Sequence, residues 1–293
     1  MLAVLYALVF LVGASIGSFL NVCIGRWPAG ESVVRPPSRC PSCGHRIAWH
    51  ENVPVLGWLF LRGRCAGCGG RISIQYPIVE LVVGLGWLAA VWWFGLGFTG
   101  LRVAMFGTIL LGIAITDLKY YLIPDGFTVF GLLWVIATAL AAPFIESSAL
   151  FAGPWDSLIG ACVGAGAIAI AGWLGEAALK KEAMGFGDVT LMAMAGAALG
   201  PTRSLLTIFI GALLGAVAFL LVVYPVTAWR RRGTRPAAPV AALASPDGPA
   251  TEEDEGPGMP LVPFGVFLAP AAMVTLLWGD ALVRWYVGLI QGG

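Results

Sequence analysis

Long runs of apolar residues alternate with shorter polar segments along the chain. A helix that crosses a bilayer takes roughly 17–25 residues. Runs of about this length lie near residues 2–24, 77–97, 100–118, 122–142, 156–179, 184–200, 203–227 and 261–288. The pattern predicts an all-α polytopic membrane protein with about eight transmembrane helices, of which the sixth is the shortest.

Three polar segments, 25–76, 143–156 and 228–260, interrupt the apolar runs. The last one is rich in Ala and Pro and contains the acidic run Glu252 to Glu255. Such a composition cannot bury a core, so we expect a disordered linker. A solvated tether accounts for it better than an acidic docking arm.

Composition agrees with a membrane protein, because 59% of the residues are hydrophobic, only 11% are charged and the mean hydropathy is +0.87. Soluble domains carry about a quarter charged residues. The formal net charge of +1 gives no reason to expect a nucleic-acid partner. The first run has no basic segment before it and no small-residue cleavage site, so we expect it to be retained as a transmembrane helix in the lipid bilayer.

Basic residues indicate the orientation, because cytoplasmic loops are enriched in Lys and Arg. The segment 25–76 contains Arg26, Arg35, Arg39, Arg46, Arg62, Arg64 and Arg71. Counting helices from it places Lys119, Lys180, Lys181 and Arg230 to Arg232 on the same side. The other side receives Arg203, with Arg102 and Arg284 nearby. We therefore expect a cytoplasmic cysteine loop and two periplasmic termini.

Two C-x-x-C pairs lie in this loop, Cys40 with Cys43 and Cys65 with Cys68. Two such pairs can supply four thiolates to one tetrahedral ion, and their spacing is close to that of a zinc ribbon. Four protein ligands leave no open position, so the predicted zinc is structural. Two disulfides are the alternative, which a reducing cytoplasm disfavours. His45 and His50 lie beside the first pair as surface histidines or exchangeable ligands.

Two aspartates lie at the predicted cytoplasmic edge of the bundle. Asp117 ends the third apolar run, and Asp188 opens the sixth after Gly185 and Gly187. Two carboxyl groups that share one proton can activate water, and the glycines permit close approach of a substrate backbone. The alternative is structural: Asp117 could pair with Lys119 or cap a helix, and Asp188 could be an N-cap. Asp125 is a third candidate with the pattern of an N-cap.

Two other patterns are better explained by helix packing. Gly13-Ala-Ser15-Ile-Gly17 fits a serine-hydrolase motif but lies within an apolar run, without a strand-to-helix turn. Gly160, Gly164 and Gly166 have the spacing of small residues at a helix–helix contact rather than of a nucleotide loop.

The order of these features resembles the type IV prepilin peptidase family of bifunctional leader peptidases and N-methyltransferases. The resemblance covers nearly the whole chain and includes the following segments: Gly17 to Val22 with Arg26, the two C-x-x-C pairs, Asn52 to Pro54, Leu61 to Cys65, Tyr76 to Glu80, Asp117 with Ile123 to Asp125, Gly185 to Asp188, and Pro263 to Gly265. The family is of the GxGD aspartyl protease type.

The resemblance implies that Asp117 and Asp188 are the catalytic pair of a membrane aspartic endopeptidase in the bacterial inner membrane. The implied substrates are prepilins of type IV pili and pseudopilins of type II secretion, cut after a glycine that follows a short basic leader. It also implies methylation of the new N-terminus from S-adenosylmethionine. Gly63, Arg64 and Glu80 are our candidates for binding that cofactor.

The predicted organisation is a first transmembrane helix at 1–24, a cytoplasmic four-cysteine zinc loop at 25–76, a transmembrane peptidase core at 77–227, a disordered cytoplasmic linker at 228–260 and a last transmembrane helix at 261–293. The chain departs from the family at Thr190, where a lysine is usual, and in the length of its linker. A presenilin-like intramembrane protease also uses G-x-G-D but needs no cysteine loop. A transporter would carry its ionisable groups nearer the bilayer midplane.

Overall fold

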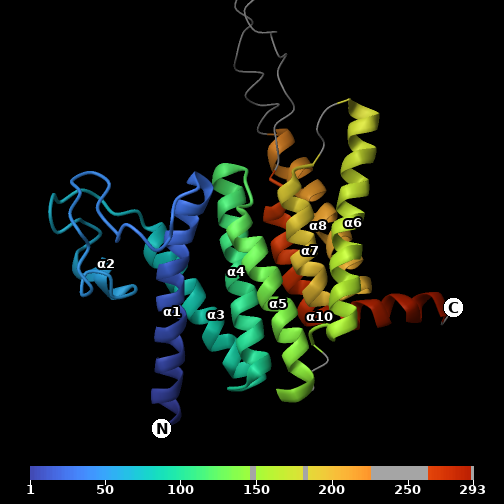
Figure 1. The fold of residues 1–293 in the computed structure, drawn as a ribbon, viewed down its shortest axis with the longest axis horizontal. Coiled ribbons are helices and arrows are strands. Elements are labelled where there is room, and N and C mark those ends of the chain that lie inside the picture. The colour runs from blue at the N-terminus through green and yellow to red at the C-terminus, as the bar shows by residue number, and fades with distance from the viewer. Residues whose placement is uncertain (146–149, 181–183, 226–262, 292–293) are drawn as a thin grey trace, which may run out of the picture.

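The computed structural model describes residues 1–145, 150–180, 184–225 and 263–291, and Figure 1 shows them as a helix bundle with a polar segment at its side. The helices are α1 (Leu2–Arg26), α2 (Leu56–Phe60), α3 (Gln75–Phe94), α4 (Phe98–Tyr120), α5 (Asp125–Ile145), α6 (Pro154–Leu179), α7 (Phe186–Leu199), α8 (Pro201–Ala218) and α10 (Gly265–Gln291). A 3-10 turn, η1 (Trp27–Ala29), follows α1, and a π-helical turn, η2 (Phe219–Val223), extends α8. Within the described residues there is no strand beyond two isolated bridges, so the all-α prediction is confirmed.

Seven of the described helices are long and apolar enough to cross a membrane. The eighth apolar helix, α7, has 14 residues and is therefore about 21 Å long. Glycine limits it at both ends, since Gly185 precedes it and Gly200 ends it with a φ of 80°. A multi-pass membrane protein is confirmed. The predicted linker at 228–260 lies outside the described residues.

Close helix contacts depend on glycine at two places. In α1, a Cβ on Gly17 would lie 2.8 Å from the Cα of Glu80 in α3, so no larger residue fits. The stretch from Gly13 to Gly17 is the middle of α1, which confirms that it is not a serine-hydrolase turn. It brings α1 and α3 together as a small-residue contact does.

The second close contact joins α6 and α7. A Cβ on Gly160 would contact the carbonyl oxygen of Gly196, and one on Gly164 would contact that of Met192. The packing prediction is confirmed for Gly160 and Gly164, whereas Gly166 faces open space. Because α7 also packs against α5 and α10, it lies in the middle of the bundle. Its C-terminal half is therefore almost entirely buried.

Candidate active site

Asp117 lies three residues before the end of α4, where its carboxyl group meets the start of α10. The side chain is buried, and its Oδ2 accepts a hydrogen bond of 3.0 Å from the backbone N–H of Val266. The N–H of Gly265 also contributes to this contact. The first N–H groups of a helix have no partner within the helix, so a carboxylate there satisfies them. Asp117 is thus held in place by a helix 149 positions away in the sequence.

Asp188 lies in the first turn of α7, where the backbone N–H of Asp188 donates to the carbonyl oxygen of Gly185. The side chain is half-buried, and Asp117 is near enough for its charge to act on the Asp188 carboxyl group. The structure therefore brings together the two aspartates that the sequence singled out, from the end of α4 and the start of α7.

Ile123, in the loop after α4, lies against the starts of α7 and α10. A Cβ on Gly187 would lie 2.8 Å from the Cβ of Ile123, and a Cβ on Gly265 would lie 2.8 Å from its Cδ1. The same atom on Gly265 would lie 2.9 Å from Oδ2 of Asp117. Glycine at these two positions therefore lets the starts of α7 and α10 approach the loop after α4.

Gly185 has a different environment from Gly187. Among the described residues, a Cβ on Gly185 would meet only the backbone nitrogen of Gly187, at 4.0 Å, and the residue is exposed. The backbone at Gly185 therefore has room for an approaching peptide strand next to the described residues.

The contacts of the two aspartates test the structural alternatives, which were helix capping or an ion pair with Lys119 for Asp117 and an N-cap role for Asp188. The N-cap of α7 is Gly185, so Asp188 is not the N-cap residue. Lys119 donates to Oε1 of Gln75 at 2.6 Å, and the ion pairs of the described residues do not join it to Asp117. Asp117 does cap a helix, α10, and this contact orients the carboxyl group.

Asp125 and Thr190 have local roles. Asp125 begins α5 and is exposed, as an N-terminal helix residue would be. Thr190, which stands where the family usually has a lysine, donates its hydroxyl to the carbonyl oxygen of Gly187 at 3.0 Å. Its side chain is therefore satisfied by its own helix.

The four cysteines form one cluster, built from two turns of the same shape. Cys40 donates its N–H to the carbonyl oxygen of His45, and Cys65 donates to that of Gly70. Each turn passes through a glycine with positive φ, Gly44 at 74° and Gly69 at 70°. This repeated geometry directs both thiols of each pair to one point.

The distances between the sulfur atoms are those of a metal site. The Sγ atoms of Cys40 and Cys68 are 3.9 Å apart, as are those of Cys43 and Cys65, and all four lie within 4.8 Å of one another. A tetrahedral ion with metal–sulfur bonds of about 2.3 Å requires sulfur separations of about 3.8 Å. The cysteines are free, and these separations exceed a disulfide bond. The cluster can therefore bind a metal, and backbone N–H groups of Cys43 and Ser42 help by lowering the pKa of Cys40 to about 6.

His45 lies between the two turns without joining the cluster. Its Nε2 lies 3.1 Å from Oε2 of Glu51, and that carboxylate also accepts from the N–H of Ala48 at 2.9 Å. The hydrogen bond from Ala48, with His45, lowers the pKa of Glu51. His45 therefore acts as a structural contact of the loop.

A cavity of about 540 Å³ separates the cysteine loop from α1 and α3. Its lining includes Asn21, Glu80 and Trp58. Oδ1 of Asn21 is buried without a hydrogen-bond partner among the described residues, and Oε2 of Glu80 accepts from the N–H of Val55 at 2.7 Å. Carboxylate and amide oxygens in one cavity suit a ligand that carries positive charge and N–H donors.

Gly63 and Arg64 are not among the residues that line this cavity. Gly63 has a φ of 67° and packs on the ring of Trp58, while Arg64 forms a backbone bridge with Arg71. Of the three residues predicted to bind S-adenosylmethionine, only Glu80 lies on the cavity wall, and the role of the other two stays a prediction.

Comparison with known proteins identifies the family. Residues 11–94 match the model of the bacterial peptidase A24 N-terminal domain, and residues 104–220 match that of the type IV leader peptidase family. The chain is 36% identical to the prepilin leader peptidase/N-methyltransferase of Myxococcus xanthus over 94% of this chain and 90% of the relative. It belongs to the type IV leader peptidase family.

Other leader peptidases give similar agreement. The chain is 32% identical to the prepilin leader peptidase/N-methyltransferase of Pseudomonas aeruginosa, over 94% of this chain and 91% of the relative. The type 4 prepilin-like proteins leader peptide-processing enzyme of Escherichia coli is 38% identical over 64% of this chain and 75% of its own length. No solved structure matches the chain significantly. The family resemblance found in the sequence is confirmed.

The two family models divide the molecule at the α3–α4 connection. The first covers α1 from residue 11, the cysteine loop and α3, and the second contains Asp117, Ile123 and Asp188. α10 lies outside both matches, although its first turn holds Asp117.

Sequence reasoning gave no role to Ile123 or Gly265, which set the spacing around the aspartates of this leader peptidase. Both stood within motifs noted for the family resemblance. In the sequence, Ile123 precedes a proline and Gly265 lies near the start of an apolar run, and these are the features that could have drawn attention to them. Only the folded chain shows that the two residues meet.

Proposed function

We propose that this protein is a prepilin leader peptidase, an aspartyl protease that cuts the basic leader from type IV prepilins and type II secretion pseudopilins at the cytoplasmic face of the inner membrane. The observation that supports the proposal most is that Asp117 and Asp188, which come from different helices, lie near each other at one end of the bundle. Family membership and the names of the relatives support the substrate class.

The two aspartates would divide the chemistry of peptide hydrolysis. One carboxylate takes a proton from water as the water oxygen attacks the scissile carbonyl carbon. The other, protonated, donates a hydrogen bond to the carbonyl oxygen. When the tetrahedral intermediate collapses, the C–N bond breaks and the amine leaves with the proton taken from water. Contacts with Gly265 and Val266 fix the Asp117 carboxyl before substrate arrives.

The position of the pair suits the proposed substrate. A prepilin has an apolar helix after its leader, and such a helix would lie against the bundle while its basic leader stays in the cytoplasm. Asp117 lies at the end of a membrane helix, as cleavage between leader and helix requires. The exposed backbone at Gly185 supplies a place for the extended peptide.

Cleavage of a co-expressed prepilin tests this proposal, with wild type, Asp117→Asn, Asp188→Asn and Asp125→Asn at matched membrane levels. Asparagine keeps the size and the hydrogen-bond acceptor of aspartate but cannot serve as the base. We expect uncut precursor with the first two variants and normal cleavage with Asp125→Asn, an exposed aspartate on the neighbouring helix. Cleavage by both dyad variants would refute the assignment. A product cut within its transmembrane helix would favour the presenilin-like alternative.

A second activity, N-methylation of the new N-terminus, fits the cavity between the cysteine loop and α1 and α3. The relatives' names pair peptidase with N-methyltransferase. S-adenosylmethionine supplies a methyl group from a cationic sulfonium when it is bound. Glu80 and Asn21 would hold it, because their oxygens provide negative charge and a free acceptor. A structural zinc on Cys40, Cys43, Cys65 and Cys68 would keep the wall of this cavity in shape.

A further inference from the structure

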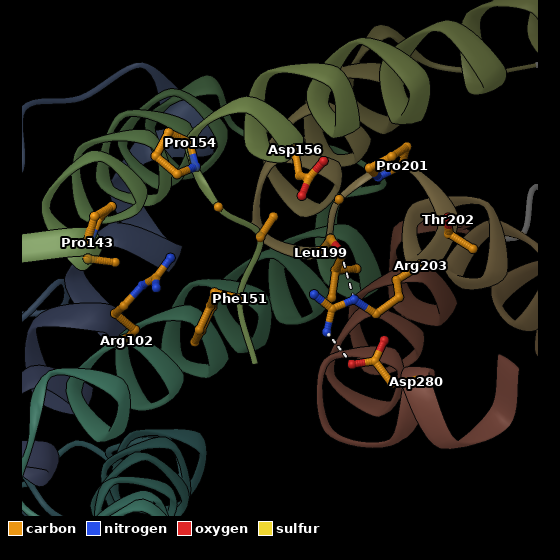
Figure 2. Close-up of a pocket in the computed structure, with 14 residues that line it drawn as sticks. Arg102, Pro143, Phe151, Pro154, Asp156, Leu199, Pro201, Thr202, Arg203 and Asp280 are labelled. Atoms are coloured by element: carbon orange, nitrogen blue, oxygen red, sulfur yellow. Dashed lines mark hydrogen bonds and ion pairs between the residues drawn. The ribbon is translucent and has the colours of Figure 1, made fainter. Parts of the chain in front are cut away.

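A second cavity, of about 630 Å³, lies at the end of the bundle opposite the aspartates (Figure 2). Arg102 and Asp117 both belong to α4 and are 15 residues, or about 22 Å, apart along its axis. Two helices, α6 and α8, begin in the wall of this cavity with Pro154 and Pro201, and α4 reaches it in its second turn with Arg102. The N-termini of α6 and α8 add partial positive charge to it.

Arg102 is the unusual residue of this cavity. Its side chain is only 2% exposed, and its Nε and Nη2 atoms have no hydrogen-bond partner among the described residues. The guanidinium lies against the ring of Phe151, 4.1 Å from the ring centroid to Cζ. A ring satisfies the flat face of a guanidinium but leaves the N–H donors in its plane unpaired.

Arg203, on the other side of Phe151 in Figure 2, is fully engaged by contrast. It donates to the carbonyl oxygens of Leu199 and Leu150 and lies 3.6 Å from Oδ2 of Asp280. The second carboxylate of the cavity, Asp156, also interacts with Arg203. The two carboxylates therefore offset Arg203, and the ion pairs of the described residues leave Arg102 without an anion.

The described residues supply no counterion to Arg102, and a buried cation is costly without one, so an anion in the cavity would stabilise the folded protein. We propose that this cavity binds a phosphate group through Arg102, and that the group belongs to an anionic phospholipid headgroup. The site is separate from the proteolytic one and does not depend on the proposed function.

The level of the cavity in the membrane supports a lipid as the source of the phosphate. Strongly exposed tryptophans mark this end: Trp93 near the end of α3, Trp155 at the start of α6 and Trp285 in α10. Tryptophan is enriched where the hydrocarbon meets the headgroups. In Figure 1 the C-terminal part of α10 runs across the direction of the other helices, as a segment lying along the membrane surface does.

Purified full-length protein, stripped of lipid in a neutral detergent, allows the test. Phosphatidylglycerol, phosphatidylcholine and inorganic phosphate are added separately, and thermal unfolding and bound lipid by native mass spectrometry are measured. We expect phosphatidylglycerol to bind and to raise the Tm of wild type more than phosphatidylcholine does. Inorganic phosphate that stabilises as well as the lipid would keep the phosphate site but overturn the lipid as its source.

Arg102→Gln is compared with Arg284→Gln, which removes the same charge from an exposed position one helical turn beyond Asp280. We expect Arg102→Gln to weaken phosphatidylglycerol binding by about tenfold or more, and Arg284→Gln to change it little. Without lipid, Arg102→Gln should be at least as stable as wild type, because the substitution removes a buried charge that has no ion-pair partner among the described residues. Lower stability without any anion, or unchanged lipid binding, would overturn the proposal.

Discussion

Asp117 combines a contact that supports the fold with the catalytic role that we propose for it. Its carboxyl group accepts a hydrogen bond from the N–H of Val266 in the first turn of α10, and its charge acts on Asp188. The sequence pointed to this residue because an ionisable group at the end of a membrane helix is expensive and usually functional. It could not show the contact with Val266, which depends on how the last helix packs.

Because Asp117 accepts a hydrogen bond at the start of α10, two substitutions of this residue should differ in their effect on stability. Asp117→Ala removes the acceptor and should lower the stability of the protein by about 1–2 kcal/mol. Asp117→Asn keeps an acceptor, so its stability should stay near that of wild type although its activity is lost. Thermal unfolding in detergent measures both. Equal stability of wild type and Asp117→Ala would contradict the role of this hydrogen bond.

Gly265 offers a second test at the residue scale. A methyl group there would lie 2.9 Å from Oδ2 of Asp117, so Gly265→Ala should displace the carboxyl group. We expect prepilin cleavage to fall by about tenfold or more, a typical result of misplacing a catalytic group by a fraction of an ångström. Gly288→Ala, at a position facing open space in the same helix, is the control and should cleave normally. Steady-state kinetics distinguish the two.

Among the elements, helices were the most predictable, because long apolar runs have few alternatives in a bilayer. The last run was expected from residue 261, whereas α10 begins at Gly265, next to Asp117. The cysteine cluster was also predicted, since each C-x-x-C pair fixes its own local turn. The cavity between the cysteine loop and the bundle was not predicted. Its walls come from α1, α3 and the loop, and no local sequence pattern specifies the distance between these segments.

The cysteine loop should contain one zinc ion per chain. We expect Cys40→Ser to lose the metal, and Cys162→Ser, which changes an exposed cysteine in α6, to keep it. Elemental analysis of the purified proteins measures the ratio of metal to protein. Zinc in the Cys40→Ser protein at the level of wild type would contradict the site.

Glu80 joins the loop to α3 through the N–H of Val55, at a distance of 2.7 Å. Glu80→Ala should therefore reduce methyl transfer by about tenfold or more, since a buried charged acceptor is lost. Cleavage should change much less, because the aspartates are held by other helices. Glu31→Ala, at an exposed loop position, is the control. Mass spectrometry of the pilin N-terminus reports both reactions, and an equal loss of both would argue against separate sites.

For the whole molecule, orientation remains the main prediction from the sequence. The basic residues place the cysteine loop in the cytoplasm and both termini outside it, provided that α7 counts as a crossing. Its ends support that count, since Asp188 meets the end of α4 whereas Leu199 borders the cavity at the start of α4. Reporter fusions at residue 293 and within the cysteine loop should therefore report opposite sides. The same side for both would remove α7 from the crossings.

The shortness of α7 has a consequence for how a cut site would be chosen. A helix of about 21 Å does not span a hydrocarbon layer of about 30 Å, and α7 is surrounded by other helices rather than by lipid, so we expect Asp188 at its start to lie below the level of the headgroups. We therefore expect the depth of a bond in the membrane to decide whether it is cut. The distance of the bond from the last charged group of the leader would then matter more than a pocket for its side chains. We expect two leucines inserted between the leader's last basic residue and the glycine to move the bond past the aspartates and stop cleavage, whereas conservative changes after the cut should be tolerated.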